Sequence, residues 1–281
     1  VTYTPPMLDA GKDFRTMGSR GGETLEIVGV SVGNTNTKFG LFHGHELRES
    51  GALPSDGTEA LCRAIVAMAD RLGSSGAGQA IVVASVNATA SRPLMAALDG
   101  ATEKPIYQVG PDLPVPLHGR LDHEAMTGHD RALNALAAFE IMKQAVVVVD
   151  AGTAITVDFI DGEGVFHGGA IAPGVTTALK ALHSATDALP EVPFVRPDPH
   201  PFGANTQQAM LNGVFYGARG LVRALVERYA EAYSGFPLVV ATGGDAEMLF
   251  GDDELVDRVI PDLTLLGIVI ACERALHGAD E

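Results

Sequence analysis

The sequence predicts an α/β fold built from two similar halves with a central cleft. Two segments, residues 29–37 and 148–156, carry this prediction, because each is an apolar strand that enters a small polar turn and continues as a second strand. In each segment a glycine, Gly33 or Gly152, stands two positions after a polar residue, Ser31 or Asp150. A glycine there lets the backbone approach a phosphate, whose oxygens the neighbouring N–H and hydroxyl groups can bind. The paired turns therefore predict that both halves contact a phosphorylated ligand.

The first half is expected to begin with three strands in a row, as in an antiparallel meander. A helix follows, because apolar residues recur at helical spacing from Leu61 to Leu72. The expected elements are, in order, strands at 25–31, 37–42 and 47–52, a helix at 57–72, a strand at 80–86, a helix at 90–99 and a strand at 106–109.

The second half is expected to repeat this pattern. Pro173 suits the first turn of a helix, and Asn205 or Thr206 can cap the long helix that follows a proline-containing loop at 190–203. The expected elements are, in order, a helix at 130–143, strands at 145–150, 154–160 and 164–170, a helix at 173–184, a helix from about 206 to 233, a strand at 237–241 and a helix at 263–277.

The order β-β-β-α-β-α-β thus occurs once and roughly repeats, which matches the duplicated ribonuclease-H-like halves of actin-like ATPases. Three early strands in each half disfavour a plain doubly wound sheet, which the sequence nevertheless leaves open. The predicted organisation is a flexible tail at 1–24, an N-terminal half at 25–125 and a C-terminal half at 126–281.

The composition narrows the functional classes. An apolar fraction of 46% is ample for a core, and the formal net charge of −16 argues against nucleic acid or an anionic membrane as the main partner. A phosphate site must then rely on backbone N–H groups, metal ions and a few arginines. Cys62 and Cys272 suggest reduced, buried thiols, and no run of residues is long enough to span a membrane. We therefore expect a cytoplasmic protein.

Asp150 is the first candidate for chemistry. It ends an apolar strand, so its carboxylate is expected at the mouth of a cleft, where a hard divalent cation prefers oxygen ligands shared with phosphate and water. An Asp-Gly hairpin without a ligand is the alternative interpretation.

A second candidate is the segment Gly128-His129-Asp130-Arg131. Asp130 could act as general base for a substrate hydroxyl, and Arg131 could hold an anionic group. The alternative is helix capping, because an Asp in the first turn complements the helix dipole. His129 fits a neighbouring turn residue better than a catalyst.

Two glycine-rich turns add weaker signals. The segment 168–174 leads into a helix N-terminus and could cradle an anion, or it could be a tight strand-to-helix turn. The segment Thr242-Gly243-Gly244-Asp245 follows a buried strand and would allow close approach of a nucleotide, although Gly-Gly turns are common.

None of these motifs is specific alone, but their order and spacing are. The series Gly-Asn-Thr, Gly-x-Asp-Arg, Asp-x-Gly-Thr-Ala, Gly-Gly-x-Ile-x-Pro-Gly, Asn-Thr and Thr-Gly-Gly resembles the type III pantothenate kinase family over about residues 25–270. Further matches lie at 84–86, 205–209 and 262–267, and at Gly213. This family includes proteins of the Bvg accessory factor type, which are named for a regulatory role.

The resemblance implies an acetate-and-sugar-kinase/actin fold and a homodimer. It implies phosphoryl transfer from ATP to pantothenate, giving 4'-phosphopantothenate in the first step of coenzyme A biosynthesis, with Mg²⁺ or another divalent cation and K⁺ or NH₄⁺. It assigns Asp130 as the catalytic base and Asp150 as the metal ligand. Pantothenate would contact Gly128, His129, Asp130, Arg131 and Thr206. ATP phosphates would lie along Ser31, Gly33, Asn34, Thr35, Lys38, Gly152, Thr153, Gly243 and Gly244.

Ser31 departs from the family pattern, which has an aspartate there. A neutral hydroxyl is a poor Mg²⁺ ligand, so metal and phosphate would be held less firmly where transferring charge must be stabilised. Two alternatives to a pantothenate kinase therefore stay open. One is a catalytically impaired homologue with a ligand-binding or regulatory role, and the other is a kinase for another small hydroxy acid.

Overall fold

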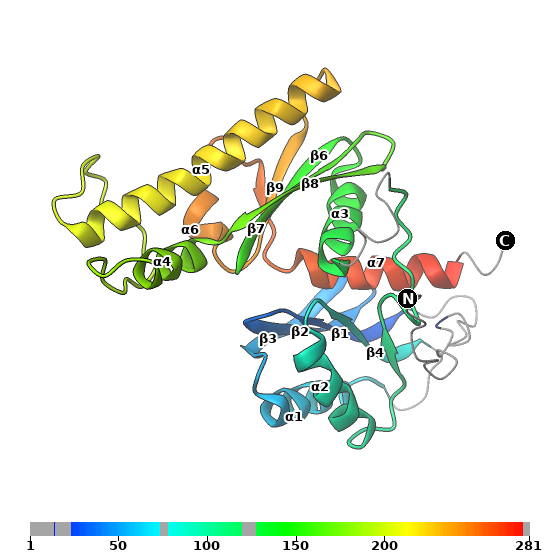
Figure 1. The fold of residues 1–281 in the computed structure, drawn as a ribbon. Coiled ribbons are helices and arrows are strands. Elements are labelled where there is room, and N and C mark those ends of the chain that lie inside the picture. The colour runs from blue at the N-terminus through cyan, green and yellow to red at the C-terminus, as the bar shows by residue number, and fades with distance from the viewer. Residues whose placement is uncertain (1–13, 15–23, 74–77, 120–127, 278–281) are drawn as a thin grey trace, which may run out of the picture. The chain divides into compact units, whose positions relative to one another are not determined.

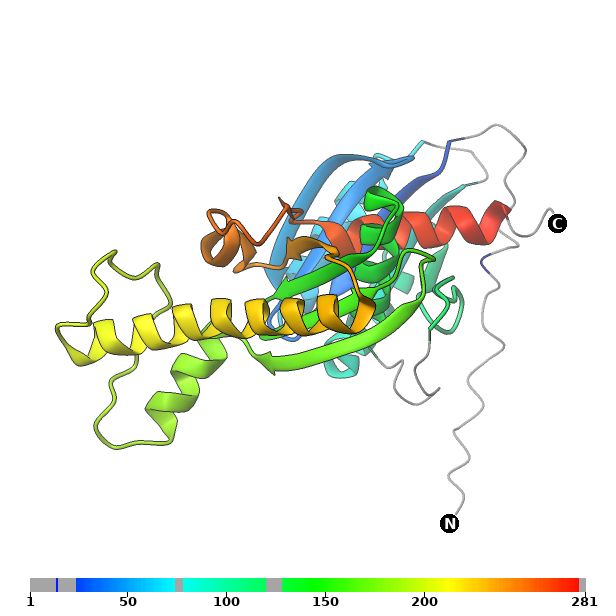
Figure 2. The ribbon, with the colours of Figure 1, turned by 90° about the horizontal axis from the view of Figure 1, so that it is seen from above.

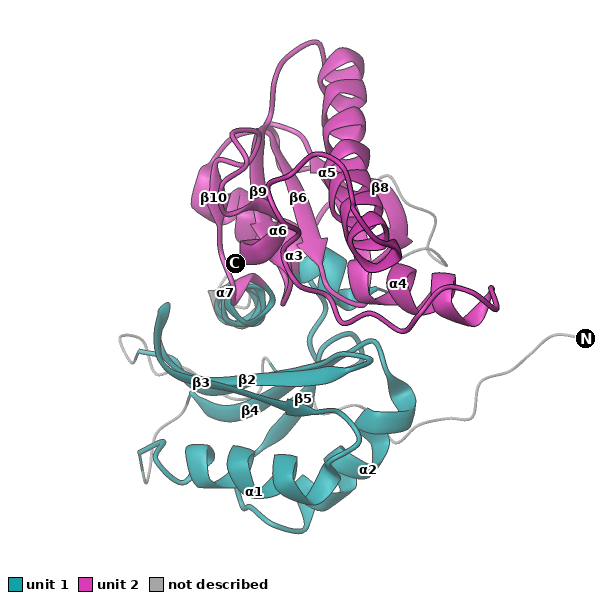
Figure 3. Cartoon of the chain, turned by 90° about the vertical axis from the view of Figure 1, so that its left-hand side faces the viewer, with its two compact units in different colours: residues 1–116, 127–133, 264–281 teal, residues 117–126, 134–263 magenta. Residues whose placement is uncertain are grey.

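The computed structural model describes residues 14, 24–73, 78–119 and 128–277 (Figure 1). The chain forms two compact units (Figure 3). Unit 1 comprises residues 1–116, 127–133 and 264–281, and unit 2 comprises residues 117–126 and 134–263. The last helix therefore belongs to the first unit, although it lies at the far end of the chain.

Unit 1 contains a five-stranded sheet of order β3-β2-β1-β4-β5. The first three strands form an antiparallel meander, and β4 and β5 extend the sheet in parallel with β1. Its elements are β1 (Glu26–Val32), β2 (Asn36–His43), β3 (Glu46–Pro54), α1 (Thr58–Ala69), β4 (Gln79–Ser85), α2 (Ala88–Asp99), β5 (Ile106–Gln108) and α7 (Leu263–His277).

The two faces of this sheet are covered by different helices (Figure 3). Val28, Val30 and Val32 point to the core formed with α1 and α2. Gly29 faces α7, because a Cβ there would lie 3.8 Å from the side chains of Leu265 and Ile268. Since strand residues alternate between faces, Ser31 lies on the α7 face of the sheet.

Unit 2 repeats the architecture in a sheet of order β8-β7-β6-β9-β10. The first three strands are again antiparallel, and β9 and β10 run parallel with β6. Its elements are α3 (His129–Met142), which begins in unit 1, β6 (Val146–Ala151), β7 (Ala154–Ile160), β8 (Phe166–Pro173), α4 (Val175–Ser184), α5 (Thr206–Tyr233), β9 (Leu238–Thr242), α6 (Ala246–Phe250) and β10 (Arg258–Val259).

The second sheet also has two distinct faces. Val147 and Val149 of β6 pack in a core with α5 and α6 residues such as Phe215 and Leu249. Asp150 lies on the opposite face by strand alternation, and there it contacts α3. The polar residue at the end of the first strand thus points away from the two-helix layer in both units.

The repeated strand order confirms the predicted duplicated α/β fold. One local expectation was wrong, and one strand was not predicted. Pro173 ends β8, where it pairs with Ala154, and the extended backbone of Gly174 separates it from α4. The two-residue strand β10 was not predicted, because so short a segment shows no alternation. The predicted tail at 1–24 lies almost entirely outside the described residues, but Phe14 is buried with its ring 4.9 Å from that of Tyr107.

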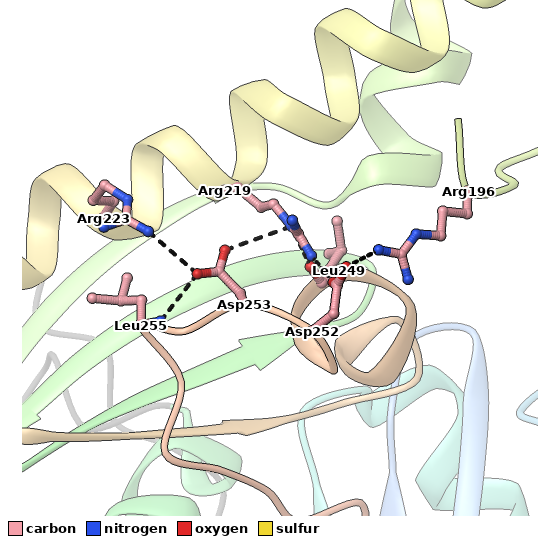
Figure 4. A network of polar contacts seen from close by, with 7 residues as sticks. All are labelled: Arg196, Arg219, Arg223, Leu249, Asp252, Asp253 and Leu255. Atoms are coloured by element: carbon pink, nitrogen blue, oxygen red, sulfur yellow. Dashed lines mark hydrogen bonds and ion pairs between the residues drawn. The ribbon is translucent and has the colours of Figure 1, made fainter. Parts of the chain in front are cut away.

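A network of ion pairs fixes the connection between α4 and α5 (Figure 4). This connection, at 185–205, has no helix or strand and lies beside the N-terminal half of α5 (Figure 2). Arg196 in it binds Asp252, which also binds Arg219 of α5. The Arg219 guanidinium stacks 4.7 Å from the centre of the Phe215 ring. The predicted irregular loop therefore has a defined anchor within unit 2.

In the described part of the chain, no helix combines the length and the apolar character needed to cross a membrane.

Candidate active site

The first predicted phosphate turn consists of residues 33–35 between β1 and β2. The Gly33 N–H donates to the Asn36 carbonyl over 3.1 Å. A Cβ on Gly33 would lie only 2.8 Å from that carbonyl oxygen, so the turn needs a glycine here. Asn34 and Thr35 at its tip are exposed. The turn can therefore offer backbone groups to a ligand.

Ser31 and Lys38 are directly paired across β1 and β2. Residues paired in this way share one face of an antiparallel sheet, with Cβ atoms roughly 4.5–5.5 Å apart. Lys38 therefore lies on the α7 face of unit 1 together with Ser31. This places a cationic side chain beside the position at which the first turn lacks a carboxylate.

The second predicted phosphate turn, residues 152–153, is one residue shorter than the first. The Gly152 N–H donates to the Ala154 carbonyl over 2.9 Å. The Thr153 carbonyl accepts hydrogen bonds from the Gly174 N–H at 3.0 Å and the Thr177 hydroxyl at 2.6 Å. Thr153 is exposed, and a Cβ on Gly152 would meet no atom within 4 Å. Open space therefore lies over Gly152.

Asp150 lies between α3 and the turn that follows β9. The Asn134 side-chain amide donates to Asp150 Oδ2 over 2.9 Å. On the other side, Gly243 has a φ of +99°, and a Cβ there would lie 2.5 Å from Asp150 Oδ1. Glycine is required at 243 for both reasons. The Asn134 amide thus orients one oxygen of the Asp150 carboxylate, and the Gly243 backbone lies close to the other. A carboxylate held in this way suits the role of ligand to a hard cation.

Asp245 completes the Thr-Gly-Gly-Asp turn. Its N–H donates to the Ala151 carbonyl over 3.0 Å, so the turn is attached to the strand that carries Asp150. Burial raises the pKa of the Asp245 carboxyl above its usual value. Gly244, in contrast, is exposed, and a Cβ there would meet nothing within 4 Å.

The first turn of α3 carries the candidate base. Asp130 is half-buried, and its Oδ1 accepts a hydrogen bond from the Arg131 N–H at 2.8 Å. His129 packs against Gly110, since a Cβ on Gly110 would lie 2.6 Å from the His129 Nε2 atom. Asp130 and Asn134 are four residues apart and so share one face of the helix. Packing against Gly110 thus occupies the His129 ring.

The structure groups the predicted residues by unit. Unit 1 holds the first turn with Ser31 and Lys38, and also Gly128 through Arg131; unit 2 holds Asp150, the second turn, the Gly243-Gly244 turn and Thr206. Thr206 is the exposed first residue of α5, whose cap is the Asn205 side chain, accepting from the Gln208 N–H at 2.9 Å.

Sequence reasoning missed three residues that support these groups: Ser55, Asn134 and Thr177. Asn134 could have been found, because it is a polar residue in an apolar helix, one turn after Asp130. No local pattern marks Ser55 or Thr177, whose contacts come from the packing of distant segments.

Solved structures with a similar arrangement of strands and helices identify the fold. A Baf-family protein from Campylobacter jejuni, named as a transcriptional activator, is 20% identical with a TM-score of 0.58, covering 90% of this chain and 98% of the other. An archaeal actin homologue is 15% identical with a TM-score of 0.50, covering 89% and 99%. The fold is therefore that of the actin-like ATPases.

Sequence comparison identifies the family within this fold. The family model of type III pantothenate kinase matches residues 27–228. The type III pantothenate kinase of Anaeromyxobacter sp. strain Fw109-5 is 34% identical over 253 residues, which cover 88% of this chain and 99% of the relative. The chain belongs to the type III pantothenate kinase family, and it is a phosphotransferase. The resemblance stated from the motifs is confirmed.

Proposed function

We propose that the protein transfers the γ-phosphoryl group of ATP to the hydroxyl of pantothenate, giving 4'-phosphopantothenate, the first step of coenzyme A biosynthesis. Membership of the family over nearly the whole chain is the observation that carries the proposal. The duplicated turns support it, because each unit presents a glycine-containing turn at the end of its first strand.

ATP phosphates would bind to the backbone of both turns. Gly33, Asn34 and Thr35 would contribute from unit 1, while Gly152 and Thr153 would contribute from unit 2. The open space over Gly152 and Gly244 supports close approach of a nucleotide to the backbone at these positions. Lys38 would supply positive charge near the phosphates, since it lies beside Ser31.

Asp150 would hold the divalent cation. Within the described residues no group of three His, Cys, Asp or Glu side chains could hold a metal ion, so the cation would be shared between Asp150, water and the phosphates. Mg²⁺ fits this set, because it is usually bound by one or two carboxylates, water and substrate phosphates. When bound, the ion would neutralise developing negative charge on the phosphates. A monovalent cation, K⁺ or NH₄⁺, is part of the proposal through the family resemblance.

Asp130 would orient the pantothenate hydroxyl and accept its proton as it attacks the phosphate in line. Asp130 lies in the first turn of α3, where its Oδ1 accepts a hydrogen bond from the Arg131 N–H. Arg131 would pair with the pantothenate carboxylate. Gly128, His129 and Thr206 would complete the acceptor site, with His129 acting through the shape of its packed ring.

The test is direct phosphorylation of pantothenate by purified protein with ATP, Mg²⁺ and K⁺, with the product identified by mass spectrometry. Asp130→Asn keeps the size of the side chain, so the protein should fold while turnover falls by roughly 10²–10⁴-fold. Asp70→Asn, at the exposed C-terminus of α1, is the matched control and should keep wild-type turnover. Near-normal turnover of Asp130→Asn would remove Asp130 from the role of base.

We further propose that the protein works as a cytoplasmic homodimer. Exposed apolar side chains on α5, Tyr216 and Leu221, support an interface along this helix. Sedimentation equilibrium at micromolar concentration should give the dimer mass; a monomer alone would contradict the proposal.

Ser31 is the one observation that favours a second candidate function. A homologue that binds the ligands without efficient catalysis would bind ATP and pantothenate in calorimetry but form no product. A kinase for another small hydroxy acid would differ only in the molecule that accepts the phosphoryl group. Testing a panel of such acids in the same assay would identify that acceptor.

A further inference from the structure

Ser55 is a buried residue that contacts the first phosphate turn, to which it is not adjacent in sequence. It lies between β3 and α1, is 3% exposed, and is 22 residues from Gly33. Its hydroxyl donates to the Gly33 carbonyl over 2.9 Å, and its N–H donates to the Thr35 carbonyl over 3.0 Å. One residue therefore binds both ends of the turn.

The hydroxyl of Thr37 extends this contact into a chain of hydrogen bonds. Thr37 is fully buried, and its Oγ1 lies 3.0 Å from Ser55 Oγ. A serine hydroxyl has a single hydrogen, which Ser55 already donates to Gly33. Thr37 must then be the donor to Ser55. The chain runs from Thr37 through Ser55 to the Gly33 carbonyl, and it fixes the rotation of the Ser55 hydroxyl.

These contacts set the orientation of two peptide planes. In a trans peptide the C=O and the N–H of the same unit point in opposite directions. Because the Gly33 and Thr35 carbonyls point toward Ser55, the N–H groups of Asn34 and Asn36 point away from it. The turn thus presents two backbone donors on the side opposite Ser55, as an anion site requires.

Unit 2 repeats this arrangement with different residues. The Thr153 carbonyl in the second turn accepts from the Gly174 N–H and the Thr177 hydroxyl, which belong to the segment between β8 and the first turn of α4. This segment corresponds to the one that contains Ser55, because each joins the third strand of its sheet to the next helix. In each unit one backbone N–H and one side-chain hydroxyl from this segment thus orient the carbonyls of the turn.

We propose that Ser55, oriented by Thr37, is a positioning residue that holds the 33–35 turn ready for the phosphates of the nucleotide. This inference rests on the proposed function, which identifies the nucleotide as ATP. Ser55 does not touch the ligand itself. It acts by keeping the Asn34 and Asn36 N–H groups in place before the ligand arrives, which lowers the cost of ordering the turn on binding.

The experiment measures binding of Mg²⁺-ADP by calorimetry to the wild type and to Ser55→Ala, Thr37→Val and Ser91→Ala. Ser91 is the matched control, because it is a serine of the same unit, 4% exposed, in α2. Ser55→Ala should weaken nucleotide binding by about fivefold to tenfold. Thr37→Val should weaken it less, by about threefold, since Ser55 keeps its donor bond to Gly33. Ser91→Ala should bind within twofold of the wild type.

Steady-state kinetics supplies a readout that general destabilisation would not move. Ser55→Ala should raise KM for ATP and leave KM for pantothenate unchanged. Wild-type nucleotide affinity in Ser55→Ala, or an equal loss in Ser91→Ala, overturns the proposal. If Ser55→Ala does not fold, wild-type affinity in Thr37→Val overturns it instead. A wild type that binds Mg²⁺-ADP but does not phosphorylate pantothenate refutes the proposed function alone, because the binding comparison still decides the role of Ser55.

Discussion

The side-chain amide of Asn134 donates a hydrogen bond to Asp150 Oδ2 over 2.9 Å, and so joins α3 to the end of β6. Asn134 is 2% exposed. A buried amide that donates to a carboxylate oxygen holds the carboxylate in one orientation. The helix that carries the proposed base thus also positions the proposed metal ligand.

Removing this amide should weaken the cation site. Asn134→Ala should lower the apparent affinity for Mg²⁺ in the kinase reaction by about 10- to 100-fold, as is typical when a group that orients a metal ligand is lost. The measurement is the dependence of the rate on Mg²⁺ concentration at saturating ATP. Asn87→Ala is the control, because Asn87 caps α2 through the Ala90 N–H and has no proposed role at the metal. An unchanged Mg²⁺ dependence in Asn134→Ala would exclude this role.

Restoring a carboxylate at position 31 should strengthen the phosphate site. We expect Ser31→Asp to change the free energy of unfolding little without metal, and to tighten Mg²⁺-nucleotide binding about tenfold, because one charge-assisted contact is worth roughly 1.5–3 kcal/mol. Lys38, paired with position 31, would offset part of the added charge. Calorimetry with Mg²⁺-ADP tests this, and Ser31→Asn, which has the same shape without the charge, is the control.

The kinetic effect of Ser31→Asp separates two accounts of this position. If the wild type is inactive and Ser31→Asp is active, the protein is a disabled kinase. A wild type that turns over well and is slowed by Ser31→Asp would mean that the metal is held by another route.

A methyl group at position 152 should block the ligand without disturbing the fold. A Cβ on Gly152 meets no atom within 4 Å. The free energy of unfolding of Gly152→Ala should therefore lie within about 0.5 kcal/mol of the wild-type value. If phosphate approaches the backbone there, nucleotide affinity should fall at least tenfold. Thermal unfolding and calorimetry measure the two effects. Gly100→Ala, with ordinary contacts of 3.8 and 3.9 Å at the end of α2, should change neither. Full nucleotide affinity in Gly152→Ala would place the phosphates elsewhere.

Asp161 should make the second unit sensitive to acid. Burial disfavours the charged form of Asp161, but hydrogen bonds from the His167 ring and from the Val165 and Glu163 N–H groups outweigh it and hold the pKa below its usual value. A lowered pKa stabilises the folded state above the unfolded-state pKa of about 3.9, and this contribution is lost as pH falls through the folded-state value.

The measurement is the free energy of unfolding in urea between pH 6 and pH 3. Glu26 and Asp252 also have lowered pKa values, so the comparison with Asp161→Asn isolates the contribution of Asp161. The wild type should lose more stability toward pH 3 than Asp161→Asn does. Equal losses would show that Asp161 contributes nothing to the acid sensitivity.

Most of the helices and strands could be predicted from the sequence, because apolar spacing is a local signal. The apolar run in β1 and the helical spacing in α1 lie within single elements, and the glycines of the turns stand beside them. Pro173 shows the limit of such signals. A proline suits both the start of a helix and the end of a strand, and only its pairing with Ala154 decided between the two.

The sequence by itself determined the duplicated order of strands and helices and the residue types at each turn, since these depend on neighbours in the chain. Only the tertiary structure decided which distant residues support those turns. Ser55 reaches Gly33 because the β2–β3 register returns the chain to the turn, and α7 joins unit 1 because Leu265 and Ile268 pack on Gly29. Such contacts depend on how separate elements pack, which no local pattern of residues encodes.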